Sequence, residues 1–200
     1  MAHGRHDPAP DRDPRVAGLL PLLAAPRPAD DEEASHLARL AALLETSLRP
    51  FDRGRFAPGH ATASGFVLHP DGRRLLLVRH RRLGIWVQPG GHVDPADGGP
   101  EAAARREVAE ETGIAGLVRL GSLLDVDVHD FPARPGGEPA HRHFDVRFAY
   151  AAAGAALDPN DEVDEVRWVA RDELRDLGVD RSILRPAAKL LGVEASPDPL

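Results

Sequence analysis

Three carboxylates within residues 106–111 (REVAEE) are the side chains best placed to do chemistry. Glu107, Glu110 and Glu111 are spaced i, i+3 and i+4, so in a helix their carboxylates share one face. Like charges at this spacing repel by roughly a few tenths of a kcal/mol per pair, and the dipole near a helix C-terminus disfavours anions by about 0.3–1 kcal/mol each. A hard cation such as Mg²⁺ or Mn²⁺ would reverse this balance, because it takes carboxylate oxygens as ligands. The alternative is a solvated acidic face, the usual role of a run of charges.

The sequence just upstream favours the cation. Residues 88–94 (QPGGHVD) form a glycine-rich loop that leads to the same segment, and glycine lets backbone atoms approach a phosphate–metal cluster closely. Pro100 suits the first position of a helix and Gly113 the position just past its end, which predicts a helix of about three and a half turns between them. Loop and helix together therefore predict a site for phosphate and metal.

The order of these residues matches a known signature. Residues 106–114 read REVAEETGI, and Gly91 is followed six positions later by Asp97. This pattern resembles the box of the Nudix hydrolase family, G-x5-E-x7-R-E-U-x-E-E-x-G-U, in which U is a bulky aliphatic residue. Asp97 replaces the first glutamate, and the gap from Asp97 to Arg106 is one residue longer than the signature, which leaves the role of Asp97 open. The resemblance covers about residues 62–193.

The resemblance implies a metal-dependent pyrophosphohydrolase, in which water attacks a phosphorus atom of a nucleoside diphosphate linked to another moiety, such as a nucleotide or a sugar, or of a modified nucleoside triphosphate. It makes Glu107 and Glu111 the main ligands of Mg²⁺ or Mn²⁺, Glu110 a further or water-mediated ligand, and Gly91 a ligand through its carbonyl. Arg106 would orient the carboxylates through charge-assisted hydrogen bonds. The alternative for Arg106 is an ordinary surface pair with Glu110, worth about 0.3–0.5 kcal/mol.

The general base of such a reaction is less closely defined. In the family it is either a glutamate of the box or an acid on a later loop, and Asp161, Glu162 and Asp164 precede the last predicted strand. We choose Glu162. The alternative is a polar turn after residues 159–160 (PN), because turns favour Asp and Asn in any case.

Seven of the ten histidines lie between residues 60 and 143. In strands, alternate side chains project to one face, which predicts two polar rows: His141, His143 and Asp145 in one, and Asp125, Asp127 and His129 in the other. Side by side, these rows would line a substrate pocket and contact phosphate or a second metal through imidazole. The alternative is a solvated sheet face, which is the default for an antiparallel pair.

Other side chains near the box are candidates for binding the substrate. His92 either contacts the substrate or faces solvent. Phe131 and Phe144 are candidates for stacking on a nucleobase, whereas Trp86 and Trp168 stand in strand-like apolar runs that indicate core packing. The predicted substrate-binding set is therefore His92, His129, His141, His143 and Phe144.

Elements that position these residues can be assigned along the chain. We expect a disordered terminus at 1–14, a helical extension at 15–58, and the Nudix hydrolase domain at 59–195. The extension contains an amphipathic helix at 31–48, which either covers the sheet or forms a homodimer contact. Strands are predicted at 62–68, 75–78, 117–128, 143–152 and 163–169, and further helices at 171–177 and 181–191. The fold class is α/β, with a mixed (α+β) sheet; the resemblance implies a Nudix-type α/β/α sandwich.

Composition excludes several classes of function. With 200 residues and 42% hydrophobic content the chain is long enough for a core, and it has no apolar run that would span a membrane. It has no cysteine, which excludes disulfides, thiolate zinc sites and a cysteine nucleophile. A net charge of −7 argues against nonspecific binding of nucleic acid. We expect a cytoplasmic protein.

Rival functions remain within the same fold. Isopentenyl-diphosphate isomerase shares it, but that activity uses a catalytic cysteine, which is missing here. A DNA-binding regulator would need a basic helix-turn-helix after about residue 169, where only some thirty residues remain. A catalytically weak Nudix-like nucleotide-binding module stays open as the alternative.

Overall fold

The computed structural model describes residues 11–24, 27–133 and 136–192, so most of the expected disordered terminus and the expected domain end at residue 195 lie outside the described residues. In chain order the elements are α1 (Arg15–Leu23), α2 (Asp31–Thr46), β1 (His60–Leu68), β2 (Arg74–His80), β3 (Trp86–Val87), β4 (Gly90–His92), α3 (Pro100–Thr112), β5 (Leu117–Arg119), β6 (Asp125–Phe131), β7 (His141–Ala152), β8 (Val163–Ala170), α4 (Glu173–Asp176) and α5 (Arg181–Leu191).

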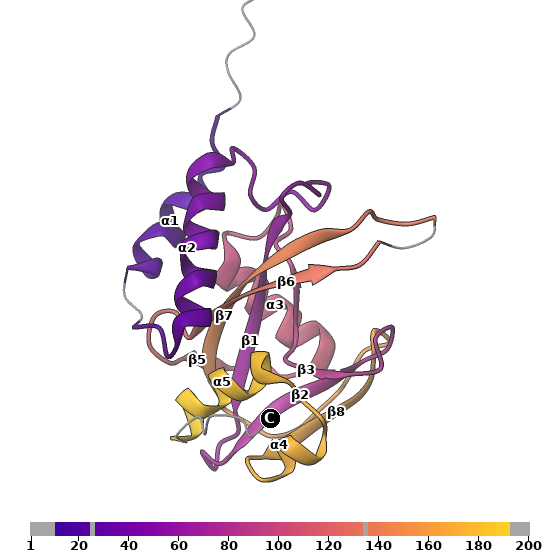
Figure 1. Cartoon of the computed structure of the whole chain (residues 1–200). Helices are drawn as coiled ribbons and strands as arrows, with labels where there is room; N and C mark the ends of the chain where they lie inside the picture. Colours follow the sequence, from indigo (N-terminus) through magenta and orange to yellow (C-terminus); the bar gives the residue numbers. More distant parts are fainter. Residues whose placement is uncertain (1–10, 25–26, 134–135, 193–200) are drawn as a thin grey trace, which may run out of the picture.

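A curled mixed sheet forms the centre of the molecule, as Figure 1 shows. β1 runs parallel to β7 and antiparallel to β2 and β4, and β6 pairs antiparallel with β7. β1 (HATASGFVL) is buried on both faces, as expected for a strand in the middle of a covered sheet. The mixed α/β fold class is therefore confirmed.

Helices cover both faces of this sheet. In Figure 1, α3 lies behind β1 and α5 in front of it. Alternate residues of β1 enter two hydrophobic clusters: Val67 packs in the cluster that contains Val108 of α3, and Phe66 in the cluster that contains Ile183 of α5. The central strand of the sheet is therefore packed between two layers of helices.

Helix α3 begins and ends where the sequence predicts. Pro100 occupies the first turn, and Gly113 ends the helix in the left-handed conformation with φ 72°, where its N–H donates to the carbonyl of Ala109. Ala104 and Val108 are fully buried against the sheet. The apolar side of α3 is thereby fixed on the core, and Glu111, three residues after Val108, is buried on the same side, facing β4.

The N-terminal helices pack on the same core. Asp30 caps α2 by accepting a hydrogen bond from the N–H of Glu33 at 2.8 Å, and Leu40 and Leu44 are fully buried in the cluster that contains Val126 of β6. The predicted amphipathic helix thus covers the sheet. A homodimer contact stays a prediction.

Two details of the predicted strands were wrong. The single strand expected at 117–128 is two strands, because Gly121 adopts a positive φ of 69° in a turn between β5 and β6, both of which pair with β7. The glycine-rich loop contains a short strand, β4, that pairs with β1.

No helix in the described part of the chain combines the length and apolarity needed to span a membrane.

Candidate active site

A pocket of about 750 Å³ opens where β1, β4, β6 and β7 face the C-terminal half of α3. Its wall contains nine of the residues that the sequence singles out: Gly91, His92, Glu107, Glu111, His129, Phe131, His143, Asp145 and Glu162. The structure therefore brings together residues from the box, from a later loop and from both polar rows.

Two glutamates of α3 form one wall of the pocket. Glu111 is only 7% exposed and accepts a hydrogen bond from the N–H of Gly90 at 3.0 Å. A Cβ atom at Gly91 would lie 2.4 Å from Oε1 of Glu107, so glycine lets β4 pass this carboxylate without displacing it. The backbone of Gly91 and the two carboxylates consequently meet at one place.

These carboxylates are held in an environment that disfavours their charge. Burial, with the charges of Glu107 and Glu162 adding to it, raises the pKa of Glu111 to about 8. Burial also raises the pKa of Glu107, although the nearby Arg106 opposes the shift. A divalent cation would offset the repulsion between these oxygen donors, which are the ligand type that Mg²⁺ and Mn²⁺ prefer. The residues present therefore fit a divalent metal ion.

Arg106 joins the loop to the helix. Its guanidinium donates two hydrogen bonds to Asp97, at 3.1 and 3.0 Å, one to Glu107 at 3.0 Å, one to Glu110 at 2.9 Å, and one to the carbonyl of His92 at 3.0 Å. Burial tends to raise the pKa of Asp97, but the hydrogen bonds from Arg106 and from the N–H of Asp94, together with the charges of Arg106 and Arg15, lower it below its ordinary value. The longer loop thus places Asp97 as an anchor for Arg106.

The remaining acids divide between the pocket and its surroundings. Glu110 points to Arg106 and is largely exposed, and it does not line the pocket. Glu162 lines the pocket from the loop before β8, whereas Asp164 lies outside it and pairs with Arg81 at 3.0 Å. Of the three acids considered for the general base, the structure places Glu162 at the pocket wall.

The two polar rows lie directly opposite each other. Asp127 pairs in register with Asp145, His129 with His143, and Phe131 with His141. The alternative of a solvated face is wrong for four of the six residues, because Asp125, Asp127, His141 and Asp145 are all less than 9% exposed, whereas His129 is exposed. His141 is buried behind His143 and, unlike it, does not line the pocket.

Phe144 is not part of the pocket, contrary to the prediction. It is 3% exposed and belongs to the hydrophobic core, because alternation along β7 turns it to the face opposite His143. Phe131 lines the pocket instead. Of the two phenylalanines, only Phe131 can contact a bound base.

Sequence reasoning placed Asp145 in the pocket but missed its partners on the floor and the residues at the rim. On the floor, Asp145 accepts hydrogen bonds from Thr62 at 3.1 Å, Ser64 at 2.7 Å and Gln88 at 3.1 Å. At the rim stand three arginines, Arg53, Arg81 and Arg82. Alternation of polar and small residues at 60–64 is the signal that could have placed β1 in the site. No spacing in the sequence indicates that the arginines converge.

Comparison with known proteins agrees with this fold and site. A sequence model of the NUDIX domain matches residues 58–190, which is more than half of the chain. The protein belongs to the Nudix hydrolase family. It is accordingly a hydrolase, in a family whose enzymes generally use divalent metal ions.

Individual relatives come from several bacteria. The chain is 37% identical over 134 residues to an RNA pyrophosphohydrolase of Caulobacter vibrioides, covering 60% of this chain and 77% of that protein. It is 36% identical over 129 residues to the putative 8-oxo-dGTP diphosphatase 3 of Mycobacterium tuberculosis, covering 60% and 56%. A NUDIX-family hydrolase from Clostridium perfringens superposes with a TM-score of 0.52 at 23% identity, covering 66% and 96%, a likeness that shows the fold alone.

Proposed function

We propose that the protein hydrolyses a pyrophosphate bond in a nucleoside diphosphate derivative and requires Mg²⁺, or Mn²⁺ in its place. The observation that carries this proposal is the burial of Glu107 and Glu111 beside the backbone of Gly91 on the wall of one pocket. Carboxylates with raised pKa values in a cleft are typical of sites that do chemistry.

Each side chain has a role in this proposal. Glu107 and Glu111, with the carbonyl of Gly91, would hold the metal ion, which when bound offsets charge on the phosphoryl oxygens and lowers the pKa of water. Arg106 fixes the carboxylate of Glu107 through its hydrogen bond at 3.0 Å. A carboxylate oxygen of Glu162 accepts the proton of the attacking water.

The rest of the pocket would recognise the substrate. The rim carries a positive charge that suits phosphate groups, from Arg53, Arg81 and Arg82. Arg81 also forms an ion pair with Asp164. Phe131 offers a ring on which a base can stack. We propose that the phosphate groups of the substrate are contacted by the imidazole rings of His92, His129 and His143.

The names of the relatives narrow the substrates to be tried. The relative from Caulobacter vibrioides is named an RNA pyrophosphohydrolase, and the one from Mycobacterium tuberculosis a putative 8-oxo-dGTP diphosphatase. A third relative, from Macaca fascicularis, is named an NAD-capped RNA hydrolase; it is 30% identical over 113 residues, covering 56% of this chain and 22% of that protein. All three substrates contain a nucleoside joined to a chain of phosphates. They form the first group to test here.

A substrate panel tests the proposal. The purified chain is incubated with 5′-triphosphorylated RNA, 8-oxo-dGTP, NADH, ADP-ribose, a nucleotide sugar and a dinucleoside polyphosphate, each with Mg²⁺, with Mn²⁺ or with a chelator, and products are separated by chromatography. We expect a nucleotide product from at least one substrate with metal and none with chelator. Undiminished hydrolysis in chelator would contradict the metal requirement, and binding of nucleotide without hydrolysis of any substrate would favour the weak binding module.

A further inference from the structure

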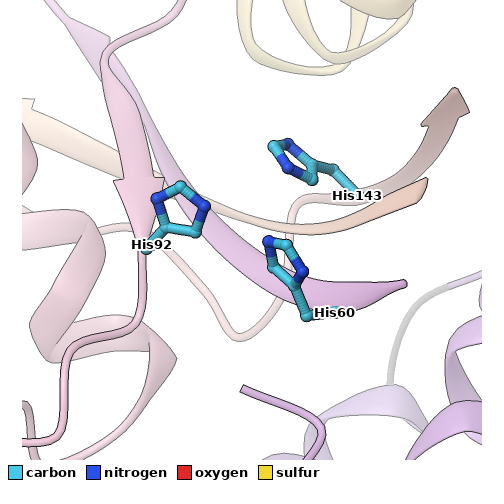
Figure 2. A group of neighbouring side chains, drawn as sticks. All are labelled: His60, His92 and His143. Atoms are coloured by element: carbon cyan, nitrogen blue, oxygen red, sulfur yellow. The ribbon is translucent and has the colours of Figure 1, made fainter. Parts of the chain in front are cut away.

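Three imidazole rings converge beside the carboxylate site, on strands that are distant in the sequence. His60 begins β1, His92 ends β4, and His143 lies near the start of β7. The register of the sheet explains the meeting, because His60 is the direct partner of His143 and His92 pairs with the neighbouring Thr62. One ring nitrogen from each histidine lies within 4.8 Å of the others, and Figure 2 shows the rings gathered around a common space.

Hydrogen bonding prepares His60 as a ligand. Its Nδ1 lies 3.1 Å from the carbonyl of Arg55, and because a carbonyl can only accept, Nδ1 must carry the proton. Burial lowers the pKa of His60, so the ring is neutral and its Nε2 has a free lone pair. This Nε2 is buried and has no hydrogen-bond partner in the described parts of the chain. Donation of the other ring nitrogen to a backbone carbonyl is the usual arrangement of metal-binding histidine.

His92 and His143 also offer ring nitrogens to this space. Nε2 of His92 is also buried and lacks a hydrogen-bond partner among the described residues. His141 donates from Nδ1 to the carbonyl of Pro139 at 2.7 Å, so its Nε2 must accept from Nε2 of His143 at 3.0 Å. That bond leaves Nδ1 of His143 with the lone pair.

Leaving such nitrogens buried and unbonded costs free energy. An unsatisfied buried polar atom typically costs about 1–3 kcal/mol, and here two lie in one cluster. A cation that accepts their lone pairs would remove the cost. Because the cluster offers only imidazole nitrogen, it does not suit Mg²⁺, which prefers oxygen.

We propose that His60, His92 and His143 form a second metal site, for a borderline divalent transition metal ion of which Zn²⁺ is the best match. Three histidine ligands leave the fourth tetrahedral position open. His92 and His143 line the pocket, so this position faces the same space as the carboxylates. Nitrogens around tetrahedral zinc are about 3.3 Å apart, so the rings turn inward slightly when the ion binds. The three histidine ligands are separate from Glu107 and Glu111, although His92 and His143 also belong to the proposed substrate contacts.

Metal binding by the full chain tests this site without reference to activity. Metal-stripped protein is titrated with Zn²⁺ in a large excess of Mg²⁺, which occupies oxygen sites, and bound zinc is counted after dialysis. Co²⁺ gives a second reading, because tetrahedral cobalt with imidazole ligands has strong visible absorption. We expect one equivalent of Zn²⁺, a tetrahedral cobalt spectrum, and a rise in Tm with Zn²⁺.

Variants assign the ligands. His60→Gln, His92→Gln and His143→Gln should each weaken Zn²⁺ binding at least 10-fold and abolish the rise in Tm. Because His60 is fully buried and its replacement can unfold the chain, the half-buried His92 provides the independent reading, with circular dichroism as the check on folding. His129→Gln is the matched control, since His129 lines the same pocket outside the cluster and should leave Zn²⁺ binding unchanged.

The opposite results would overturn the site. Absence of tightly bound Zn²⁺ in the folded wild-type chain contradicts it directly. So does zinc that remains in the histidine variants and is lost in Glu111→Gln, because that ion would then lie at the carboxylates. Failure of the substrate panel leaves this titration unaffected, so the two proposals fail separately.

Discussion

At the scale of single residues, the two glutamates in the pocket differ from an ordinary acidic surface because their charge is unfavourable in the metal-free fold. Burial raises the pKa of Glu111 to about 8, whereas an exposed carboxyl would titrate near its ordinary value of about 4.3. The same side chain should therefore be costly for stability and necessary for hydrolysis. Replacing Glu111 should therefore change stability and activity in opposite directions, which is not expected for an ordinary surface residue.

Glu111→Gln should lower metal-dependent hydrolysis more than about 100-fold, because it removes a proposed ligand of the metal ion. It should leave the free energy of unfolding of the metal-free chain equal or higher, since the amide stays neutral, whereas the carboxyl ionises on unfolding and thereby favours the unfolded state. Steady-state rates and urea unfolding in chelator check both parts. Glu165→Gln, on β8 outside the pocket, is the control. Full activity in Glu111→Gln would contradict the assignment of Glu111 as a ligand of the metal ion.

Asp97 provides a second prediction at this scale. It receives two hydrogen bonds from Arg106, which also holds Glu107 and Glu110. Asp97→Asn loses the charge of this anchor, so we expect activity about 10–100-fold lower, as for other residues that orient metal ligands. The apparent affinity for Mg²⁺ should fall as well, measured from rates against Mg²⁺ concentration. An unchanged Mg²⁺ dependence would mean that Asp97 only shapes the loop.

At the scale of elements, β6 and β7 are joined by a buried network of charges. Asp127 is hydrogen-bonded to Nδ1 of His129 at 3.0 Å and lies 3.4 Å from Arg147 and 3.6 Å from Arg185. Burial alone would raise the pKa of Asp127, but the hydrogen bond and the cations outweigh it, so the pKa lies below its ordinary range. The network thus ties α5 to the strands that line the pocket.

This lowered pKa predicts a pH dependence of stability. A carboxyl whose pKa is depressed by folding stabilises the fold above its unfolded pKa of about 4, and the contribution is lost as pH falls below that value. Asp127→Asn should therefore cost about 1–3 kcal/mol at pH 7 and progressively less below pH 4. Urea unfolding across pH measures it. A difference from wild type that grows toward acid pH would contradict the assigned sign.

Elements also show how far sequence reasoning reaches. Local signals placed α3 and its carboxylates, because Pro100, Gly113 and the box are contiguous. His60 could not be joined to His143 in this way, since 83 positions separate them and only the parallel register of β1 with β7 makes them partners. Phe144 was misplaced although alternation could have excluded it, because neighbouring strand residues project to opposite faces and Phe144 stands between His143 and Asp145.

At the scale of the whole molecule, the N-terminal helices and the catalytic fold share one core, although the family match begins only at residue 58. Lys189, the only lysine of the sequence, lies on α5 and contacts Glu33 of α2 at 2.5 Å and Asp125 of β6 at 2.9 Å. We propose 15–58 as a helical extension and 59–195 as the Nudix domain, with the extension required for stability.

Removal of the extension tests this integration. A chain that starts at residue 58 loses Leu40, Leu43 and Leu44 from the core and removes Glu33, the partner of Lys189, so it should not show a cooperative thermal transition. Leu44→Ala in the full chain is the milder variant, and burial predicts a loss of about 2–5 kcal/mol. Leu48→Ala is the matched control, because Leu48 is 43% exposed and should change stability little. Equal Tm values for the truncated and full chains would show that the extension is only an appendage on a fold that is stable without it.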